Sequence, residues 1–301
     1  MQLKYLNPLT YVRPLGSRGM LNWMPDKLYL KLCYRAYFHK KLNLDNPETF
    51  NEKIQWMKLY DRNPLYCDLV DKVNVRKHVE EKVGQTYLIP MAGGPWDNPE
   101  DIDFDALPDR FVLKCNHGSG TNILCKNKAE LDVKQTRKKL SRWMQKNWFW
   151  YGREWPYTGV KHRIYAECYM EDDRDQELRD YKFYCFNGKP EVVLVATDRA
   201  DKNKQTCFDY FDMQYQHLPM RWGKPNAKSM PQKPDNFDQM VQLAEKLAQG
   251  LHHVRIDLYS VNGKIYFGEY TFFDASGFTP FQPAEWDEKL GRLITLPAKK
   301  Q

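Results

Sequence analysis

Apolar side chains recur every three to four residues in several stretches of the chain, which is the spacing of one buried face of an α-helix. The clearest stretch is residues 237–251, which follow a cap at Asp235 or Asn236 and carry a continuous stripe of Met, Leu and Ala side chains. The same spacing predicts further helices over residues 26–37, 50–60, 68–83 and 131–150. Residues 1–66 are rich in aromatic side chains, and we expect their helices to form a packed cap.

Alternating or continuous apolar runs predict strands. Residues 192–195 are four consecutive aliphatic residues, a run long enough to cross a sheet as a buried strand. Residues 198–235 are polar and weakly patterned, which indicates a long surface loop with short strands. The other predicted strands are residues 111–115, 123–125, 163–170, 180–186 and 191–197.

Residues 254–277 predict a β-hairpin whose turn contains Asn262 and Gly263. A two-residue turn would place the two acids of the hairpin on opposite faces. A three-residue turn, with Gly263 left-handed in a bulge, would bring both acids to the same face. We predict the bulged turn, which gathers four polar side chains on one face: Arg255, Asp257, Glu269 and Thr271.

This polar face carries the first candidate chemistry. Two carboxylates on adjacent strands suit Mg²⁺, which prefers hard oxygen ligands and keeps water or phosphate oxygens in its remaining positions. Arg255 beside them is expected to bind a phosphoryl oxygen as negative charge develops on it. The structural alternative is a solvated hairpin on which Arg255 pairs with an acid.

A second candidate site follows the strand at residues 111–115. Lys114 comes at the end of this strand and precedes a loop that contains Gly118, Ser119 and Gly120. Glycines let backbone N–H groups approach phosphate oxygens, and the lysine adds a positive charge. The order differs from a P-loop, because the lysine comes first and a strand follows. A plain hairpin turn is the alternative, and His117 is expected to form hydrogen bonds within the loop.

Composition restricts the functional class. The chain has 301 residues, of which 42% are hydrophobic and 14% aromatic, as expected for a folded protein with at least one full core. The formal charge of +7 suits anionic ligands such as nucleotides, acidic sugars or a membrane-attached acidic acceptor. We expect no nucleic-acid partner, because the surplus looks modest and diffuse.

The cysteines and the apolar runs bear on location. The seven cysteines are odd in number, widely spread and without a CxxC pair, so we expect reduced thiols and neither disulfides nor a zinc site. No apolar run approaches the length of a membrane span, and the opening residues lack the apolar core of a signal peptide. A cytoplasmic location is expected.

The order of these segments resembles the ATP-grasp superfamily, and in detail its branch named after the teichuronopeptide biosynthesis protein TupA. The resemblance implies an α+β fold with two lobes whose antiparallel sheets grip ATP, preceded by a mainly helical cap. It implies a cap at residues 1–70, an N-terminal lobe at 71–165 and a C-terminal lobe at 166–301. The segments that carry it are residues 50–56, 71–72, 111–120, 166–167, 180–183, 254–259 and 268–272.

The resemblance also implies roles for individual residues. Lys72 and Lys114 would contact phosphates, and the loop at 118–120 would close over them. Asp180 would lie near the ribose, and Lys182 fits the family pattern without a defined role. The hinge that meets adenine, mainly through its backbone, would be Glu167, Cys168, Tyr169 and Met170.

The metal site follows from the same resemblance. Asp257 and Glu269 would hold Mg²⁺, usually two ions in this superfamily. Many relatives have Asn two residues after the second acid, where this chain has Thr271, whose hydroxyl is a weaker ligand. Arg255 would steady the oxyanion that forms at the acyl carbon.

The implied reaction joins an acid to an amine at the expense of ATP. For the TupA-like branch the acid is a hexuronic acid carboxyl of a surface-glycan precursor, and the partner is an amino acid or amine. Peripheral contact with a membrane-attached glycan intermediate is compatible with this assignment.

Three other readings compete with it. A phosphotransferase on the same fold would phosphorylate a glycan hydroxyl. A glycosyltransferase would use the DxD sequence of residues 173–175. A non-catalytic glycan or nucleic-acid binder would use the many Trp and Tyr residues that have basic neighbours.

Overall fold

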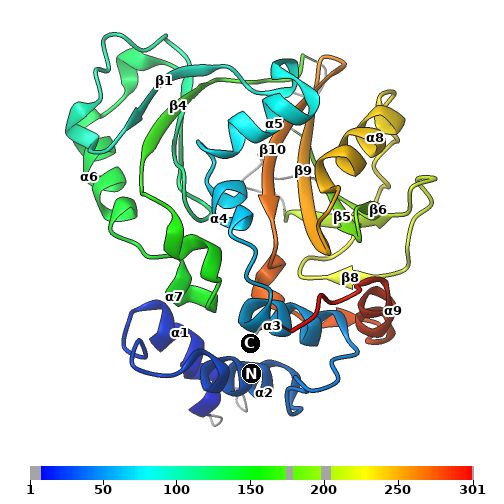
Figure 1. The fold of residues 1–301 in the computed structure, drawn as a ribbon. Helices are drawn as coiled ribbons and strands as arrows, with labels where there is room; N and C mark the ends of the chain where they lie inside the picture. The colour runs from blue at the N-terminus through cyan, green and yellow to red at the C-terminus, as the bar shows by residue number, and fades with distance from the viewer. Residues whose placement is uncertain (1–7, 174–178, 198–204, 300–301) are drawn as a thin grey trace.

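The computed structural model describes residues 8–173, 179–197 and 205–299, and Figure 1 shows two sheets above a group of helices. The smaller sheet is antiparallel with strand order β1-β4-β2-β3. The larger is antiparallel with order β10-β9-β5-β6-β7. The strands of the smaller sheet are β1 (Met91–Trp96), β2 (Phe111–Cys115), β3 (Asn122–Cys125) and β4 (Ile164–Cys168).

The larger sheet has one face covered by helix α8 (Phe237–Ala248) (Figure 1). The predicted apolar stripe of this helix is buried, and the Tyr270 hydroxyl donates to the Leu247 carbonyl 3.0 Å away. The opposite face of the sheet therefore remains for polar side chains. The strands of this sheet are β5 (Asp180–Phe186), β6 (Lys189–Thr197), β7 (Cys207–Phe211), β9 (His253–Val261) and β10 (Lys264–Thr271).

The predicted bulge at the hairpin turn is wrong. Val261 pairs with Lys264 across a two-residue turn in which Asn262 and Gly263 have φ of 50° and 77°. Such a turn matches the natural twist of the two strands. The register shift occurs instead at Gly268, between the pairs that Leu258 and Asp257 make with β10.

The bulge at Gly268 still brings the four predicted polar residues to one face. Asp257 lies opposite Glu269, and Arg255 lies opposite Thr271. A Cβ at Gly268 would come within 3.1 Å of the Asp257 carbonyl oxygen, which explains why glycine occupies the bulge. All four polar residues therefore share one face, as predicted, because a bulge within the strand replaces a bulge at the turn.

The N-terminal helices gather at one end of the molecule (Figure 1). Thr49 and Glu52 form the capping box that begins α3. Glu52 also accepts a hydrogen bond from the Asn43 backbone, 3.4 Å away. The predictions at 26–37 and 50–60 are confirmed. The elements are η2 (Pro8–Tyr11), α1 (Val12–Ser17), α2 (Asp26–Phe38) and α3 (Phe50–Tyr60).

The helix predicted over 68–83 is broken in the middle. It forms as α4 (Leu65–Val70) and α5 (Val75–Val83). Between them the Asp71 side chain accepts hydrogen bonds from the backbone N–H groups of Val73 and Asn74, at 2.8 and 3.2 Å. These bonds close a turn directly before α5 and explain the interruption. As a result Lys72 lies in a connector and not on a helix face.

The remaining elements complete the two cores. The helix predicted over 131–150 ends at Met144, and a short separate helix follows. Apolar residues of the smaller sheet and α6 form one core, while α8, the larger sheet and α2 to α5 share the other. The elements are η3 (Gln85–Tyr87), η4 (Pro99–Asp101), η5 (Lys128–Glu130), α6 (Val133–Met144), α7 (Phe149–Gly152), η6 (Trp155–Gly159), β8 (Arg221–Trp222), η7 (Asp274–Gly277), β11 (Phe281–Gln282) and α9 (Glu285–Leu293).

The boundaries predicted at residues 70 and 165 stay a prediction. None of the helices in the described part of the chain has the length and apolar character needed to span a bilayer.

Candidate active site

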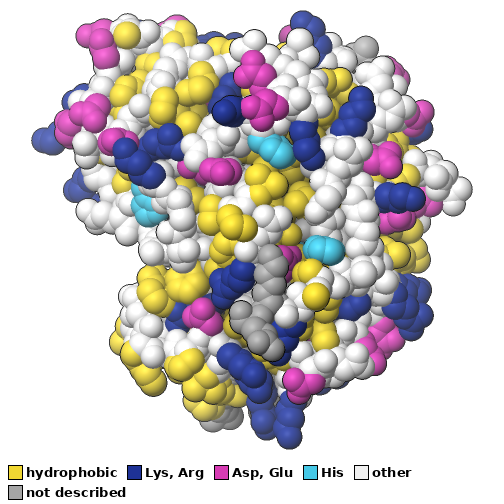
Figure 2. Space-filling view, viewed as in Figure 1, with side chains coloured by type: hydrophobic (Ala, Val, Ile, Leu, Met, Phe, Trp, Pro, Cys, Tyr) yellow, Lys and Arg dark blue, Asp and Glu magenta, His cyan; other side chains and the backbone are white. Residues whose placement is uncertain are grey.

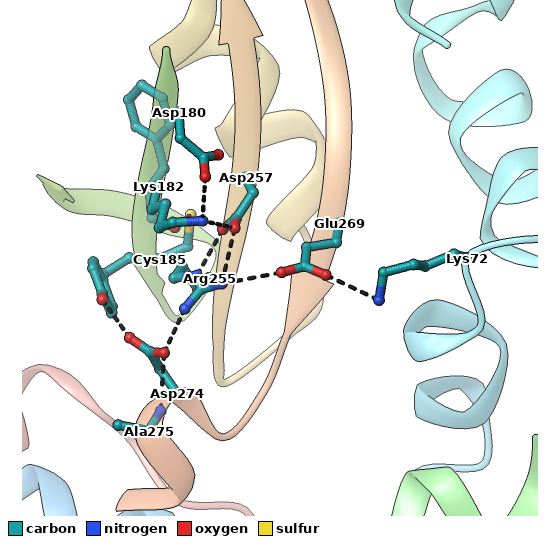
Figure 3. Close-up of polar contacts among 11 residues, drawn as sticks. Lys72, Asp180, Lys182, Cys185, Arg255, Asp257, Glu269, Asp274 and Ala275 are labelled. Atoms are coloured by element: carbon teal, nitrogen blue, oxygen red, sulfur yellow. Dashed lines mark hydrogen bonds and ion pairs between the residues drawn. The ribbon is translucent and has the colours of Figure 1, made fainter. Parts of the chain in front are cut away.

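Arg255 lies at the centre of the polar face, with carboxylates on three sides (Figure 3). Its Nε and Nη2 atoms lie 2.6 and 2.8 Å from the two carboxylate oxygens of Asp257. Nη2 also lies 3.2 Å from Glu269 Oε1, and Nη1 pairs with Asp274. A guanidinium that carboxylates hold from three directions is fixed in position, so its positive charge stays at one point of the site.

Lys182 extends the cluster across the neighbouring strand β5. It is the Cα partner of Asp257 and forms an ion pair with that side chain. A second acid, Asp180 on β5 itself, lies 2.9 Å from the same ammonium group. Burial opposes the charge on Lys182, but the two acids outweigh it and raise the lysine pKa. Asp180 and Lys182 therefore belong to the same cluster as the hairpin acids.

Lys72 joins this face to the predicted phosphate loop. Its Nζ lies 3.0 Å from Glu269 Oε2 and donates to the Gly118 carbonyl at 2.8 Å. Its backbone N–H donates to the Asn116 carbonyl at 3.0 Å. Figure 3 shows Lys72 reaching the sheet from a separate part of the chain. The break between α4 and α5 thus brings a cation to two predicted binding segments.

The two hairpin acids differ in accessibility. The side chain of Asp257 is 2% exposed, whereas that of Glu269 is 26% exposed. Burial raises the pKa of Glu269, but Lys72, Arg255 and Lys182 lower it more, so the pKa lies well below its usual range. Glu269 is therefore an ionised carboxylate that a ligand can approach.

The smaller sheet holds a second cluster of charges. Lys114 pairs with Glu167 on the adjacent strand β4, and Arg76 Nη1 lies 3.5 Å from the same acid. Arg76 also donates to the Ile89 carbonyl at 2.8 Å. Glu167, predicted to act through its backbone, thus also holds two cations with its side chain. A ligand phosphate would compete with Glu167 for both of them.

The glycine loop has the backbone that its sequence predicts. Gly118 and Gly120 have φ of 71° and 72°, which favours glycine, and Ser119 is exposed between them. A Cβ at Gly118 would come within 2.6 Å of the Trp148 ring. His117 is buried, and its Nε2 lies 3.2 Å from the Trp143 carbonyl oxygen, as expected for a loop hydrogen bonder.

The predicted hinge leads from the smaller sheet towards the larger one. Cys168 ends β4, and its N–H donates to the Pro90 carbonyl at 2.9 Å. The guanidinium of Arg110 lies 4.4 Å from the centre of the Tyr169 ring. Met170 follows without regular secondary structure. Tyr169 and Met170 thus form the irregular part of the predicted hinge, beyond the end of β4.

Asp274 is a site residue that the sequence analysis missed. It pairs with Arg255 and accepts a hydrogen bond from the Tyr184 hydroxyl. Burial raises its pKa, but Arg255 and Tyr184 lower it more, so the pKa lies below its usual value. Its signal in the sequence is an acid three residues after Thr271, next to the small residues that follow the hairpin.

A strained segment supports Asp274. Ala275 and Ser276 have φ of 47° and 57°, which is unfavourable for residues other than glycine. The buried Lys58 donates to the Ser276 carbonyl at 2.7 Å and lies 3.1 Å from its hydroxyl oxygen. The Ser276 hydroxyl donates in turn to Glu154, 2.5 Å away. These contacts hold the strained turn in place.

The hairpin acids fit Mg²⁺ in donor type. Asp257 and Glu269 offer hard oxygens with more acceptor positions than their protein partners occupy. Within the described residues, no group of three or more His, Cys, Asp or Glu side chains is arranged to hold a metal. Mg²⁺ is commonly bound through one or two carboxylates together with substrate phosphates. The pair therefore suits Mg²⁺ that arrives with a nucleotide. Thr271 lies beside it, opposite Arg255.

The predicted DxD motif only partly falls in the described region. The Asp173 backbone N–H donates to the Asn262 side chain at 3.0 Å, and the Asn262 N–H donates to Asp172 at 2.8 Å. These bonds attach the acidic turn to the tip of the hairpin. Arg174 and Asp175 lie outside the described residues.

Comparison with known proteins identifies the family. A family model described as TupA-like ATPgrasp matches residues 52–295. Comparison with curated proteins gives no match. The mixture of helices and antiparallel sheets confirms the α+β class.

Three solved structures show remote similarity. D-alanine–D-alanine ligase from Bacillus anthracis, complexed with ATP, has a TM-score of 0.41 and 16% identity, covering 68% of this chain and 55% of that one. L-amino acid ligase from Bacillus licheniformis has a TM-score of 0.45 and 10% identity, covering 85% and 55%. ATP-grasp ligase PsnB, complexed with a precursor variant, Mg and ADP, has a TM-score of 0.41 and 10% identity, covering 87% and 64%. The chain thus spans between 55% and 64% of these structures.

Proposed function

The chain belongs to the TupA-like ATP-grasp family, and from that premise we propose that it is an ATP-dependent ligase that joins a carboxylic acid to an amine. The observation that carries the proposal is the position of Lys72. It contacts both the glycine loop of the smaller sheet and Glu269 of the larger sheet. A polyphosphate between the two sheets would meet Lys72, the loop at 118–120 and the hairpin acids together.

The proposed reaction has two steps. A carboxylate oxygen of the acid substrate attacks the γ-phosphorus of ATP, and the bond to the β,γ-bridging oxygen breaks to release ADP. The amine nitrogen then attacks the acyl carbon of the acyl phosphate, inorganic phosphate leaves, and the nitrogen loses a proton. The products are an amide, ADP and phosphate, and no covalent bond to the protein is required.

Each residue has a role that its surroundings support. Lys72 and Lys114 bind phosphate oxygens, and the backbone of the loop at 118–120 covers them. Arg255, held by three carboxylates, stabilises the oxyanion at the acyl carbon. Asp180 binds the ribose, and Lys182 keeps Asp257 oriented through their ion pair.

Asp257 and Glu269 would hold Mg²⁺, with Thr271 as a weaker third ligand. The ion would neutralise charge on the transferring phosphoryl group. Adenine would contact the backbone of Glu167, Cys168, Tyr169 and Met170. Whether one or two ions bind depends on Thr271, because its hydroxyl is a weaker ligand than the Asn that many relatives have at this position.

We assign the acid substrate to the hexuronic acids of surface-glycan precursors, and the amine to an amino acid or a simple amine. The family match supports the ligase class, and the basic character of the chain is compatible with an acidic acceptor. All seven cysteines are free thiols, which agrees with the proposed cytoplasmic setting.

The test measures ADP and inorganic phosphate separately. The purified chain is incubated with Mg²⁺, ATP, glucuronate or galacturonate, and a panel of amino acids. We expect equal amounts of ADP and phosphate, and only when both acid and amine are present. Asp257→Asn should lose this activity. Asp209→Asn, at a buried acid on β7 of the same sheet, should keep it.

Other outcomes would contradict the ligase. ADP without phosphate, formed with a glycan alone, would identify a phosphotransferase. Release of UDP from a UDP-sugar, independent of Asp257, would identify a glycosyltransferase.

A further inference from the structure

The net positive charge of the chain is concentrated in its N-terminal segment. Residues 1–41 contain eight Lys or Arg and one Asp, whereas residues 42–301 contain 38 Lys or Arg and 38 Asp or Glu. The whole surplus of +7 therefore belongs to the first 41 residues, and the expectation of a diffuse surplus is wrong. Such an asymmetry indicates a surface that meets a negatively charged partner.

The same segment exposes large apolar side chains. Trp23 is 75% exposed and Met20 61%, and Tyr11 and Leu28 are each close to half exposed. Single exposed apolar residues are common, but several within one short segment mark an interaction surface. Figure 2 shows hydrophobic side chains and Lys or Arg side chains next to one another at the lower end of the molecule, where Figure 1 places α1 and α2.

Helix α2 shows how the two kinds of side chain combine. Lys27, Lys31 and Arg35 are spaced four residues apart on one exposed face, next to Leu28. The opposite face is buried through Tyr29, Leu30, Cys33, Tyr34 and Ala36. Among residues 8–173, 179–197 and 205–299, no ion pair holds these three cations. Their charge is therefore free to act on a partner.

We propose that this surface, defined by Arg18, Met20, Trp23, Lys27, Lys31 and Arg35, binds an anionic phospholipid bilayer. Trp and Met insert into the headgroup region, while the Lys and Arg stems lie along it with their charges at lipid phosphates. A soluble polyanion would use the cations but would gain little from a protruding Trp23. A second copy of the chain, docked about a twofold axis through this face, would place like charges against each other.

The surface lies close to the chemistry at one end of the hairpin. Tyr37 of α2 stacks on Phe278, with ring centres 5.6 Å apart. Phe278 follows the strained turn that supports Asp274. Binding through α2 would therefore hold this end of the site near the bilayer, which suits an acceptor carried by a lipid. The membrane proposal itself stands on charge and exposure and does not depend on the ligase reaction.

The test is co-sedimentation of the full chain with vesicles of phosphatidylcholine alone or mixed with phosphatidylglycerol. We expect binding to the mixed vesicles that weakens as salt rises. The triple variant Lys27→Glu/Lys31→Glu/Arg35→Glu should bind at least about a hundredfold more weakly, because each lost cation near an anionic surface costs about fivefold and each new acid adds repulsion.

Helix α6 offers a matched control. Lys134, Lys138 and Arg142 have the same residue types and spacing, and they are exposed on a helix of the smaller sheet. The triple variant Lys134→Glu/Lys138→Glu/Arg142→Glu changes the net charge equally and should lose much less binding. Equal loss in the two triple variants would contradict a specific surface and indicate general charge attraction.

Trp23→Ala separates a bilayer from a soluble polyanion. It leaves the charge unchanged, and we expect at least a threefold weaker binding to mixed vesicles with unchanged binding to polyglutamate. Vesicle binding that is insensitive to Trp23 would overturn the proposal. A change of oligomeric state in any of these surface variants, measured by light scattering, without a change in vesicle binding would also overturn the proposal. Melting curves of all variants check that each is folded.

Discussion

Two regions of the molecule contain several cations, and the surroundings of these cations are opposite in kind. On the polar face of the larger sheet, Arg255 is buried, Lys182 is mostly covered, and both are paired with carboxylates. On the cap, Lys27 and Lys31 are exposed, and no ion pair within the described residues holds them. The comparison separates two uses of charge. Paired and buried charges fix geometry, whereas exposed charges attract a distant partner and contribute little to stability.

The largest difference should come from the arginines of the two regions. Arg255→Ala would leave the buried Asp257 and two partly exposed acids without their common cation, at a cost of about 3–5 kcal/mol of unfolding free energy. It should also lower kcat by roughly a hundredfold to a thousandfold, through loss of oxyanion stabilisation. Arg35→Ala on the exposed face of α2 should change the unfolding free energy by less than about 0.5 kcal/mol. Urea unfolding and the phosphate-release assay measure both.

The acids of the two regions provide the second contrast. Asp274→Asn removes the charge that positions Arg255 and should lower kcat about tenfold to a hundredfold, with the KM for ATP unchanged. Asp26→Asn, at the acid of α2 that lies 3.5 Å from Arg153, should leave kcat unchanged. Tyr184→Phe removes one hydrogen bond to Asp274 and should lower kcat by a smaller factor. An altered KM with intact kcat would contradict the positioning role.

A glycine in each region sharpens the comparison. Gly268→Ala forces a Cβ against the Asp257 carbonyl and the Tyr259 ring, which should cost about 1–3 kcal/mol and lower kcat as the bulge shifts. Gly19 in the cap has φ of 79°, so Gly19→Ala should cost about 1 kcal/mol through its backbone alone. Its kcat should be unchanged. Equal activity of the two variants would show that the bulge does not set the site geometry.

The last prediction concerns the pH dependence of stability. Burial lowers the pKa of His253 on β9 to about 4, below the ordinary value of 6.5. Between pH 4 and 6.5 the unfolded chain binds the extra proton, so the stability rises with pH across this window and falls as pH drops. His253→Gln should reduce this slope by up to about 1.4 kcal/mol per pH unit.

Local patterns predicted most of the elements. The stripe of α8, the apolar spacing of α3 and the aliphatic run of β6 each carry their signal within a few residues. The break at Asp71 was missed, because it depends on side-chain hydrogen bonds that compete with a favourable helical pattern. The bulge was misplaced, because Asn262-Gly263 permits two turns and the deciding contact lies at Gly268.

For the candidate site, the sequence predicted which residues take part better than it predicted which of them contact one another. Arg255, Asp257 and Glu269 do lie together, as the hairpin pattern indicates. The contact of Lys72 with Glu269 joins residues far apart in the sequence, and no local pattern contains it. Asp274 escaped for a related reason: its partners on β5 and β9 are set by the tertiary fold.

The most direct test of the central claim is the melting temperature of three proteins with and without Mg²⁺-ATP: the wild type, Asp257→Asn and Asp209→Asn. Ligand at a hundredfold its Kd should add about 2.7 kcal/mol to the unfolding free energy. We predict this stabilisation in the wild type and in Asp209→Asn, and its loss in Asp257→Asn. Stabilisation of Asp257→Asn equal to that of the wild type, or stabilisation by a UDP-sugar in place of ATP, would contradict the account.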